Sequence, residues 1–267
     1  MRKIWVIFCL GFLMLALPAH AEIITKSVDY TDGKTELRGT LVYNDEISSL
    51  RPGVLLVPEW WGHNDYIKRR AREMAEHGYV AFAIDMYGPD KVTANPKIAQ
   101  EWAGPFYQDR KMMRQRARAG LAVLQKQVNV DKNNIAAVGF CMGGTVALEL
   151  ARDGEKLASV GAFHAGLQFP DPVAKGAVKA KIMVLNGAAD PMVPFKDRQA
   201  FIEDMQKAGA DLQFIEYSGA VHAFTNPMAD VIRKAGLEGV GYNPVAEKRS
   251  FAALYPFLQE SFGMKVN

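Results

Sequence analysis

Residues 138–144 of this sequence read VGFCMGG and end a run of small and apolar residues. Gly139, Cys141 and Gly143 match the spacing G-x-nucleophile-x-G, which is typical of a sharp turn from a strand into a helix. Glycine on either side lets the backbone approach closely, so the central side chain projects into a cleft. The pattern predicts a strand at 135–138, a reactive thiol at Cys141 and a helix at 145–151. The alternative is a structural cysteine, because a free cysteine also packs as a small hydrophobe.

The first 21 residues have the pattern of an export signal. Arg2 and Lys3 precede an apolar stretch at 4–17, and residues 18–21 read PAHA, which has the small-x-small form of a cleavage site. The apolar stretch is short for a membrane span. We expect cleavage after Ala21, which would release residues 22–267 into the periplasm or out of the cell. An uncleaved membrane anchor is the alternative interpretation.

Export would bear on the role of Cys141. The chain has two cysteines, and the other one, Cys9, lies in the predicted signal. The mature chain would then hold Cys141 with no cysteine to pair with. An accessible thiol in an oxidising compartment is open to oxidation, so we expect it to be kept for its reactivity. A deeply buried structural cysteine would escape this argument.

Composition bounds the class of protein. With 49% hydrophobic and 23% charged residues, the sequence predicts a single domain with a substantial core over residues 22–267. The formal charge is +3, and it falls close to neutral when Arg2 and Lys3 are removed. This balance does not favour nucleic acid or an anionic membrane as a partner. The basic run at 111–118 has a helical pattern and predicts a solvated helix face.

Strand-like runs alternate with helical patterns along the chain, which is typical of an α/β fold. An antiparallel hairpin is predicted around Asp32 and Gly33, a strong turn pair. Further strands are expected at 53–57, 79–84, 135–138, 157–163, 181–185 and 212–217. Helices are expected at 65–77, 107–127, 145–151, 195–208 and 245–262. Crossover helices make the later strands mostly parallel, cover both faces of the central sheet and place the strand carboxyl ends on one edge, where ligands bind.

Two further candidate catalytic residues follow strands of this predicted sheet. Asp190 comes after the strand at 181–185, and His222 follows the last strand. The order nucleophile, acid, histidine is that of α/β hydrolases. A thiol with a pKa of ~8.5 is mostly protonated at neutral pH, so His222 would take its proton and Asp190 would orient and stabilise the imidazolium. The alternatives are a turn-forming Asp190 before Pro191 and a structural His222.

A metal site is the other chemistry that these residue types raise. His63, His164 and His222 all fall near predicted strand ends, and three histidines can ligate zinc. The sequence has no H-x-x-x-H spacing and no complete ligand set. We therefore expect no metal and no other cofactor.

Taken together, the motifs GFCMGG (139–144), GAADPMVP (187–194) and GAVHAF (219–224) resemble the dienelactone hydrolase family of α/β hydrolases. The resemblance covers roughly residues 28–262 and implies an α/β-hydrolase fold. It also implies that Cys141, Asp190 and His222 form the catalytic triad.

The segment PEWWG at 58–62 resembles a further motif of that family. By this resemblance, Glu59 contacts the resting cysteine and keeps the thiol neutral until substrate displaces the carboxylate. The resemblance also implies an oxyanion hole formed by the backbone N–H groups of Trp60 and Met142. Met142 would lie at a helix N-terminus, where free donors and the helix dipole favour an anion.

The nucleophile constrains the substrate. A thiolate leaves a tetrahedral intermediate more easily than an ordinary alkoxide does, so a cysteine hydrolase favours enol lactones, activated esters or thioesters. Family members that accept a dienelactone carboxylate are expected to bind it with arginine shortly after the histidine motif, where this chain has Asn226. The resemblance therefore does not extend to dienelactone as the substrate. The side chains expected to line a more apolar pocket are Trp61, Phe163, His164, Phe224 and Asn226.

The sequence thus predicts an exported monomer that hydrolyses a small-molecule ester or lactone through a thioester acyl-enzyme, without stable membrane association after signal cleavage. Two other functions remain compatible with it. Cys141 could serve as a peroxide-reactive thiol, with an external thiol in place of a resolving cysteine. The chain could also be a non-catalytic binding protein that keeps the fold.

Overall fold

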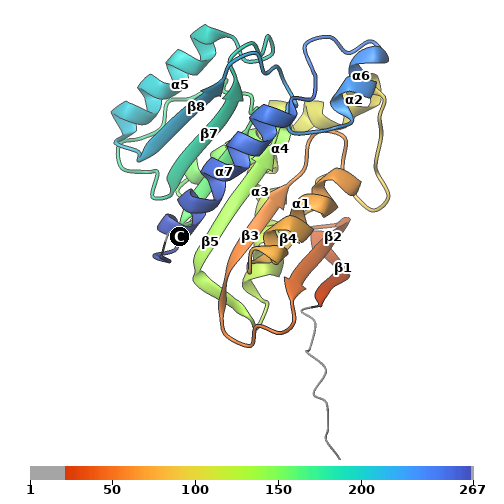
Figure 1. Cartoon of the computed structure of the whole chain (residues 1–267), viewed down its shortest axis with the longest axis vertical. Helices are drawn as coiled ribbons and strands as arrows, with labels where there is room; N and C mark the ends of the chain where they lie inside the picture. Colours follow the sequence, from red (N-terminus) through yellow and green to blue (C-terminus); the bar gives the residue numbers. More distant parts are fainter. Residues whose placement is uncertain (1–21, 266–267) are drawn as a thin grey trace, which may run out of the picture.

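One central sheet runs through the computed structural model, which describes residues 22–265 (Figure 1). Its strands are β1 (Ile23–Asp32), β2 (Thr35–Asn44), β3 (Arg51–Val57), β4 (Val80–Ala83), β5 (Val130–Phe140), β6 (Ser159–Phe163), β7 (Lys181–Gly187) and β8 (Leu212–Tyr217). Their order across the sheet is β1-β2-β4-β3-β5-β6-β7-β8. The β1–β2 and β2–β4 pairs are antiparallel and the others are parallel. The predicted hairpin and mostly parallel sheet are confirmed, whereas the predicted export signal lies outside the described residues.

Helices cover both faces of this sheet. They are α1 (Asp65–Glu76), α2 (Pro96–Gln108), α3 (Arg110–Gln125), α4 (Met142–Arg152), α5 (Phe195–Ala208), α6 (Ala229–Lys234) and α7 (Pro244–Ser261). Buried side chains of α1 and α7 pack on one face, in front of the sheet in Figure 1, and those of α3, α4 and α5 pack on the other. Within residues 22–265, every helix is too short or too polar to span a bilayer.

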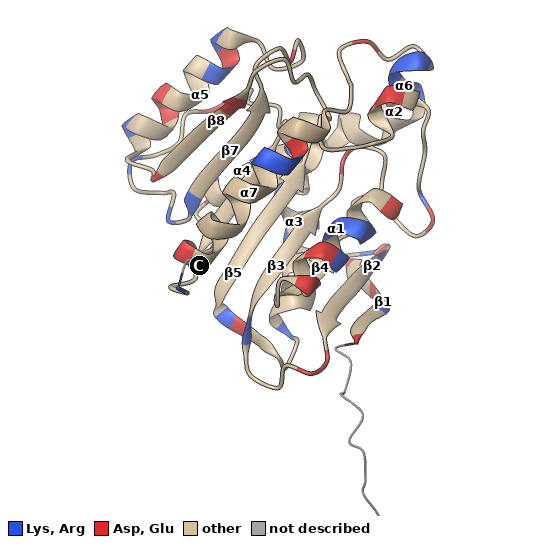
Figure 2. Ribbon diagram, in the orientation of Figure 1, with Lys and Arg blue, Asp and Glu red and all other residues tan. Residues whose placement is uncertain are grey.

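The strands are apolar along most of their length because both faces of the sheet are buried. Along β3, Leu55 and Val57 pack with α3 and α4, while Val54 and Leu56 pack with α1 and α7. This alternation is the period of two that a strand imposes on its side chains. Charged residues lie mainly on helices and in loops (Figure 2). The space between the sheet and the helices on its two faces is therefore filled mainly by apolar side chains.

The helix predicted over 107–127 is present as α3, but it begins only at Arg110. Residues 107 and 108 instead end α2, which was not predicted, and the two helices are separated at Asp109. Asp109 is extended, with φ −123° and ψ 92°, and its carboxylate accepts a 2.9 Å hydrogen bond from the backbone N–H of Met112. A carboxylate that caps the first turn in this way begins a new helix, even though the helical pattern of the sequence continues across Asp109. The short helix α6 was also not predicted.

The basic run at 111–118 does not form a solvated face as predicted. Arg114 of α3 lies 2.7 Å from Glu149 of α4, and the buried Arg116 lies 2.8 Å from Asp32 at the end of β1. These ion pairs fix α3 between α4 and the N-terminal hairpin. The positive charge of the run is therefore largely balanced within the fold.

The parallel strands end on one edge of the sheet. Four segments leave that edge close together: those after β3, β5, β7 and β8. In this topology the edge at the strand carboxyl ends is where ligands bind. The candidate site is built on these four segments.

Candidate active site

Cys141 occupies the turn between β5 and α4. Its backbone has φ 53° and ψ −118°, a conformation that residues other than glycine rarely adopt. A Cβ atom at Gly139 would collide with the carbonyl of Gly143, and one at Gly143 would collide with the carbonyl of Val57. Both glycines are therefore required by the close backbone approach that holds the turn. The Cys141 side chain caps no backbone group and is partly exposed, so its thiol is accessible.

His222 and Asp190 meet across the loops that follow β8 and β7. The Nδ1 atom of His222 lies 2.8 Å from Oδ2 of Asp190, and both side chains are buried. The other Asp190 oxygen accepts a 2.8 Å hydrogen bond from the backbone N–H of Met192, which fixes the carboxylate. Burial alone would lower the pKa of His222, but the Cys141 thiolate and Asp190 outweigh it and hold this pKa well above its usual value. The site would thus stabilise an imidazolium at His222 whenever Cys141 carries a negative charge.

The backbone of His222 is fixed by a second segment. Its N–H donates to the carbonyl of Gly239 at 3.1 Å, and its carbonyl accepts from the N–H of Gly241 at 3.0 Å. These two bonds flank Val240 and form an isolated parallel bridge. The histidine loop therefore depends on the segment that precedes α7.

Glu59 follows β3 and is almost completely buried. Its Oε2 atom accepts a 2.5 Å hydrogen bond from the side-chain amide of Asn226, while its Oε1 atom has no hydrogen-bond partner among the described residues. Burial raises the pKa of Glu59 to about 7, although the Asn226 bond and the charge on His222 act to lower it. A carboxyl group with this pKa changes protonation state readily near neutral pH.

Trp60 and Met142, the two residues expected to form an oxyanion hole, both contact the hydroxyl of Tyr87. Met142 is the first residue of α4, so its backbone N–H is not used within the helix. The hydroxyl of Tyr87 lies 3.1 Å from the carbonyl oxygen of Trp60 and 3.4 Å from the sulfur of Met142. Tyr87 was not identified from the sequence, because a tyrosine in a loop after a strand carries no motif.

A family model described as the dienelactone hydrolase family matches residues 38–262. The chain belongs to the dienelactone hydrolase family. It is accordingly a hydrolase that acts on a small molecule, and its sheet of mostly parallel strands with an N-terminal hairpin is the α/β-hydrolase fold.

Individual relatives agree with this assignment. A solved structure of a dienelactone hydrolase-like promiscuous phosphotriesterase from metagenomic libraries is 36% identical, with a TM-score of 0.85, and the match covers 90% of this chain and 99% of that one. A Bradyrhizobium sp. protein named "Probable 2-oxo-3-(5-oxofuran-2-ylidene)propanoate lactonase" is 27% identical over 234 residues, which are 82% of this chain and 92% of that protein. An uncharacterized protein of Caenorhabditis elegans is 36% identical over 154 residues, which are 56% of this chain and 94% of that protein.

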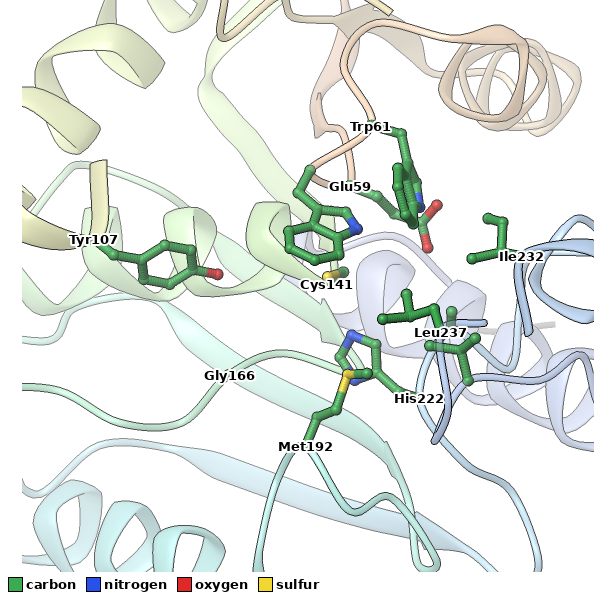
Figure 3. Close-up of a pocket in the computed structure, with 12 residues that line it drawn as sticks. Glu59, Trp61, Tyr107, Cys141, Gly166, Met192, His222, Ile232 and Leu237 are labelled. Carbon is green, nitrogen blue, oxygen red and sulfur yellow. The ribbon is translucent and has the colours of Figure 1, made fainter. Parts of the chain in front are cut away.

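In this dienelactone hydrolase family member, Cys141 opens into a pocket of about 200 Å³ (Figure 3). The lining residues are Glu59, Trp60, Trp61, Tyr107, Cys141, Gly166, Met192, His222, Ala223, Ile232, Leu237 and Val240. The candidate nucleophile, base and resting-state carboxylate therefore share one cavity. The other side chains are mainly apolar, and none of these lining residues is lysine or arginine.

Several lining residues of this family member were not found from the sequence. Tyr107 lies near the end of α2, and its hydroxyl points into the pocket toward Cys141 (Figure 3). Ile232 and Leu237 come from the excursion between β8 and α7 and lie across the pocket from Tyr107 (Figure 3), and Val240 of the same excursion also lines it. Ile232 lies on the short helix α6 and the other two in the irregular chain after it, so no periodic signal marks them as pocket residues.

Of the five side chains expected to line the pocket, the structure places Trp61 there. The other four, Phe163, His164, Phe224 and Asn226, are almost fully buried and are not among the lining residues. The two phenylalanines pack in the core between the sheet, α1 and α7. The two polar residues are used in hydrogen bonds within the protein, to Glu59 in the case of Asn226.

The three histidines considered as zinc ligands do not form a ligand set. His164 and His222 pack edge to face, with ring centroids 5.2 Å apart. Over residues 22–265, no group of three His, Cys, Asp or Glu side chains is arranged to hold a metal ion.

Proposed function

We propose that this hydrolase cleaves neutral carboxylic esters and lactones that have stabilised leaving groups, with Cys141 as nucleophile, His222 as base and Asp190 as its orienting acid. One observation carries the proposal. The thiol and the imidazole line the same pocket, and the far side of the imidazole is bonded to Asp190 at 2.8 Å. This is the relationship that activates a nucleophile in a triad.

The first half of the reaction would form an acyl-enzyme. The thiol proton passes to Nε2 of His222 while the sulfur attacks the acyl carbon, and a C–S bond forms as the carbonyl electrons move to oxygen. The backbone N–H groups of Trp60 and Met142 would stabilise that oxyanion. When the intermediate collapses, the C–O bond breaks, and the imidazolium gives its proton to the leaving oxygen. The product of this step is a thioester on Cys141.

The second half would regenerate the enzyme. His222 takes a proton from water as the water oxygen attacks the thioester carbon. The C–S bond breaks, the thiolate accepts the proton back from the imidazolium, and the free acid departs. Asp190 keeps the tautomer of His222 fixed throughout. Its carboxylate can only accept a hydrogen bond, so the Nδ1 atom that faces it keeps a proton.

We assign Glu59 to the resting enzyme. It is buried in the same pocket as Cys141, and its pKa of about 7 suits a carboxyl group that exchanges a proton with a neighbouring thiol. One of its oxygens lacks a partner among the described residues, so that atom is available to the thiol or to a substrate. In the resting enzyme this atom would contact the thiol, and arriving substrate would displace it and free the sulfur for attack.

The pocket favours neutral substrates. Its lining includes Trp60, Trp61, Met192, Ile232 and Leu237 and provides no lysine or arginine to pair with a substrate carboxylate. A cavity of about 200 Å³ fits a small acyl group or a lactone ring. The thiolate nucleophile adds its own requirement, because it is expelled before a basic alkoxide. Aryl esters, enol lactones and thioesters meet both conditions.

The test is hydrolysis of short-chain aryl esters and enol lactones by the wild type and by Cys141→Ser and His222→Ala variants. We expect both variants to lose most of their turnover, and a mass increase of one acyl group on Cys141 in wild-type protein quenched at low pH. Unchanged turnover by His222→Ala would overturn the proposal.

A second candidate activity is hydrolysis of neutral phosphotriesters. The relative that is 36% identical is a promiscuous phosphotriesterase, and the apolar, cation-free lining of this pocket suits an uncharged triester. Turnover of an aryl dialkyl phosphate, measured beside the ester assays, tests it. Activity that survives in Cys141→Ser would show that this reaction does not use the proposed nucleophile.

We also propose that the protein is exported after cleavage behind Ala21, and that residues 22–267 form one domain that acts as a monomer. The charged, apolar and small-residue segments of the N-terminus support export. Mass spectrometry of the protein from the producing cell tests the cleavage site, and sedimentation tests the monomer. A mature mass that includes Met1, or a stable dimer, would contradict the respective statement.

A further inference from the structure

A chain of buried polar side chains lies behind the nucleophile. The backbone N–H of Cys141 donates to Nδ1 of His164 at 3.1 Å, in addition to the carbonyl of Phe163 at 3.0 Å. The Nε2 atom of His164 lies 2.9 Å from the hydroxyl of Thr225, which in turn lies 2.6 Å from the hydroxyl of Tyr66. None of the side chains of His164, Thr225 and Tyr66 lines the pocket of Cys141. They are therefore not in contact with substrate.

The tautomer of His164 follows from the first member of this chain. A backbone N–H can only donate, so Nδ1 of His164 must carry a lone pair. A neutral imidazole has one proton, which is then on Nε2 and is donated to the Thr225 hydroxyl. Either hydroxyl can donate the hydrogen bond between Thr225 and Tyr66. One tautomer of His164 thus satisfies both of its ring contacts.

The surroundings keep His164 neutral. Burial lowers the pKa of this imidazole well below its usual value, and the positive charges of His222 and Arg70 act in the same direction. The Arg70 guanidinium also donates to the carbonyl of Thr225 at 2.7 Å, which fixes the backbone that carries the hydroxyl. A second proton on His164 would remove one of the two acceptors of the Cys141 N–H and leave the carbonyl of Phe163.

The chain joins three segments that must be aligned for the proposed reaction. Cys141 lies in the turn after β5, His164 follows β6 with a φ of 37°, and Thr225 lies three residues after His222. The rings of His164 and His222 are also in edge-to-face contact. A shift of the His222 loop would therefore be transmitted through Thr225 and His164 to the backbone of the nucleophile.

We propose that His164 is a positioning residue, which as a single Nε2–H tautomer holds the Cys141 turn in register with the His222 loop. This proposal rests on Cys141 as the nucleophile of the proposed function. His164 does not act as a second base, because its Nδ1 lone pair is occupied by the Cys141 N–H and its Nε2 proton by Thr225.

The sharpest test compares Thr225→Val with Thr225→Ser in the full protein. Valine keeps the shape of threonine but leaves the Nε2–H of His164 without an acceptor, whereas serine keeps the hydroxyl. An Nε2–H without an acceptor no longer holds His164 in place, and the resulting misalignment of the Cys141 turn should lower kcat roughly tenfold or more. We expect that fall in Thr225→Val, with KM for an aryl ester within about twofold of the wild type. Thr225→Ser should remain close to the wild type in both constants.

The tautomer is measured separately by NMR of protein labelled with ¹⁵N in histidine. We expect His164 to carry hydrogen on Nε2 in the wild type and in Thr225→Ser. A proton on Nδ1 in the wild type, or equal kcat values for the two Thr225 variants, would overturn the proposal. The NMR measurement needs no turnover. It therefore tests the tautomer of His164 even if the kinetics of Cys141→Ser contradict the proposed function.

A second pair of variants guards against loss of folding. His164→Asn places an amide oxygen near the position of Nδ1 and tolerates a positive φ, while His164→Ala provides no acceptor. We expect kcat of His164→Asn to exceed that of His164→Ala at least tenfold at equal KM, with both proteins folded by circular dichroism. Equal kcat values for these two variants would contradict the positioning role.

Discussion

The side-chain amide of Asn226 donates to Glu59 across 2.5 Å, and its own oxygen accepts from the backbone N–H of Met228 at 3.0 Å. The second bond fixes the amide so that its NH₂ group faces the carboxylate. Family members that bind a dienelactone carboxylate are expected to have arginine near position 226. In this chain Asn226 instead gives Glu59 a neutral hydrogen-bond donor. This lets the carboxyl group keep a pKa near neutrality, which an adjacent guanidinium would lower strongly.

Replacing Glu59 by glutamine should change how stability depends on pH. The folded-state pKa of about 7 lies above the unfolded value near 4.5, so the wild type loses stability as pH rises between these values. The loss amounts to about 3 kcal/mol above pH 7, at 1.36 kcal/mol per pKa unit. Glu59→Gln lacks this loss, and its advantage in free energy of unfolding should be absent at pH 4 and largest at pH 8.

Urea unfolding at the two pH values measures this difference. Glu101→Gln, at an exposed position on α2, is the matched control and should follow the wild type. An advantage of Glu59→Gln that is the same at pH 4 and pH 8 would show that the pKa of Glu59 is not raised by folding.

Asp190→Asn should lower kcat by about 10³- to 10⁴-fold while leaving the fold intact, since the amide supports the wrong tautomer and no longer stabilises the imidazolium. The pKa of His222 should fall, because one of the charges that raise it is lost. NMR titration of the His222 ring protons measures this shift. In Asp211→Asn, before β8, the pKa of His222 should match that of the wild type.

Tyr87→Phe should reduce kcat by about fivefold, because a buried hydrogen bond of roughly 1 kcal/mol that orients Trp60 is lost. KM should change little, since Tyr87 does not line the pocket. Steady-state kinetics with an aryl ester give both constants. Tyr217→Phe is the control, because the buried Tyr217 hydroxyl has no hydrogen-bond partner among the described residues. If both variants lose activity equally, the contact with Trp60 has no particular role.

Leu237→Arg should shift substrate preference toward esters that carry a carboxylate. Leu237 lies on the pocket wall, where no lining residue is cationic, and a guanidinium there would pair with a substrate anion. We expect kcat/KM for a carboxylate-bearing ester to rise relative to its neutral isostere by about tenfold. Leu237→Met keeps the wall apolar and should leave the ratio unchanged. An unchanged ratio in Leu237→Arg would place this side chain outside the substrate site.

The strands and the turn at Cys141 could be predicted because local patterns determine them. A strand buried on both faces has to be apolar along its length, and the turn tolerates only glycine at positions 139 and 143. Asp190 and His222 could also be located, since parallel strands end on one edge and both residues follow such strands. The break at Asp109 was missed, because the apolar pattern continues across it and only the capping bond reveals it.

The pocket wall was the least predictable part of the site. Phe163 and His164 end a strand at the correct edge, yet they point into the core rather than into the cavity. The direction of a side chain at a strand end depends on the register of the turn that follows, which the sequence does not state. Ile232 lies on the short helix α6 and Leu237 in the irregular chain after it, an excursion whose path depends on tertiary contacts.

The bridge between His222 and Val240 has a consequence for redesign of this enzyme. Val240 lines the pocket of the proposed nucleophile, while its neighbours Gly239 and Gly241 hold the backbone of the proposed base. Selectivity and turnover are thus mechanically linked through three consecutive residues. Laboratory evolution that exchanges this segment freely will trade rate for new substrates, whereas a library confined to residues 232–237 can diversify recognition while the bonds that hold the base are retained.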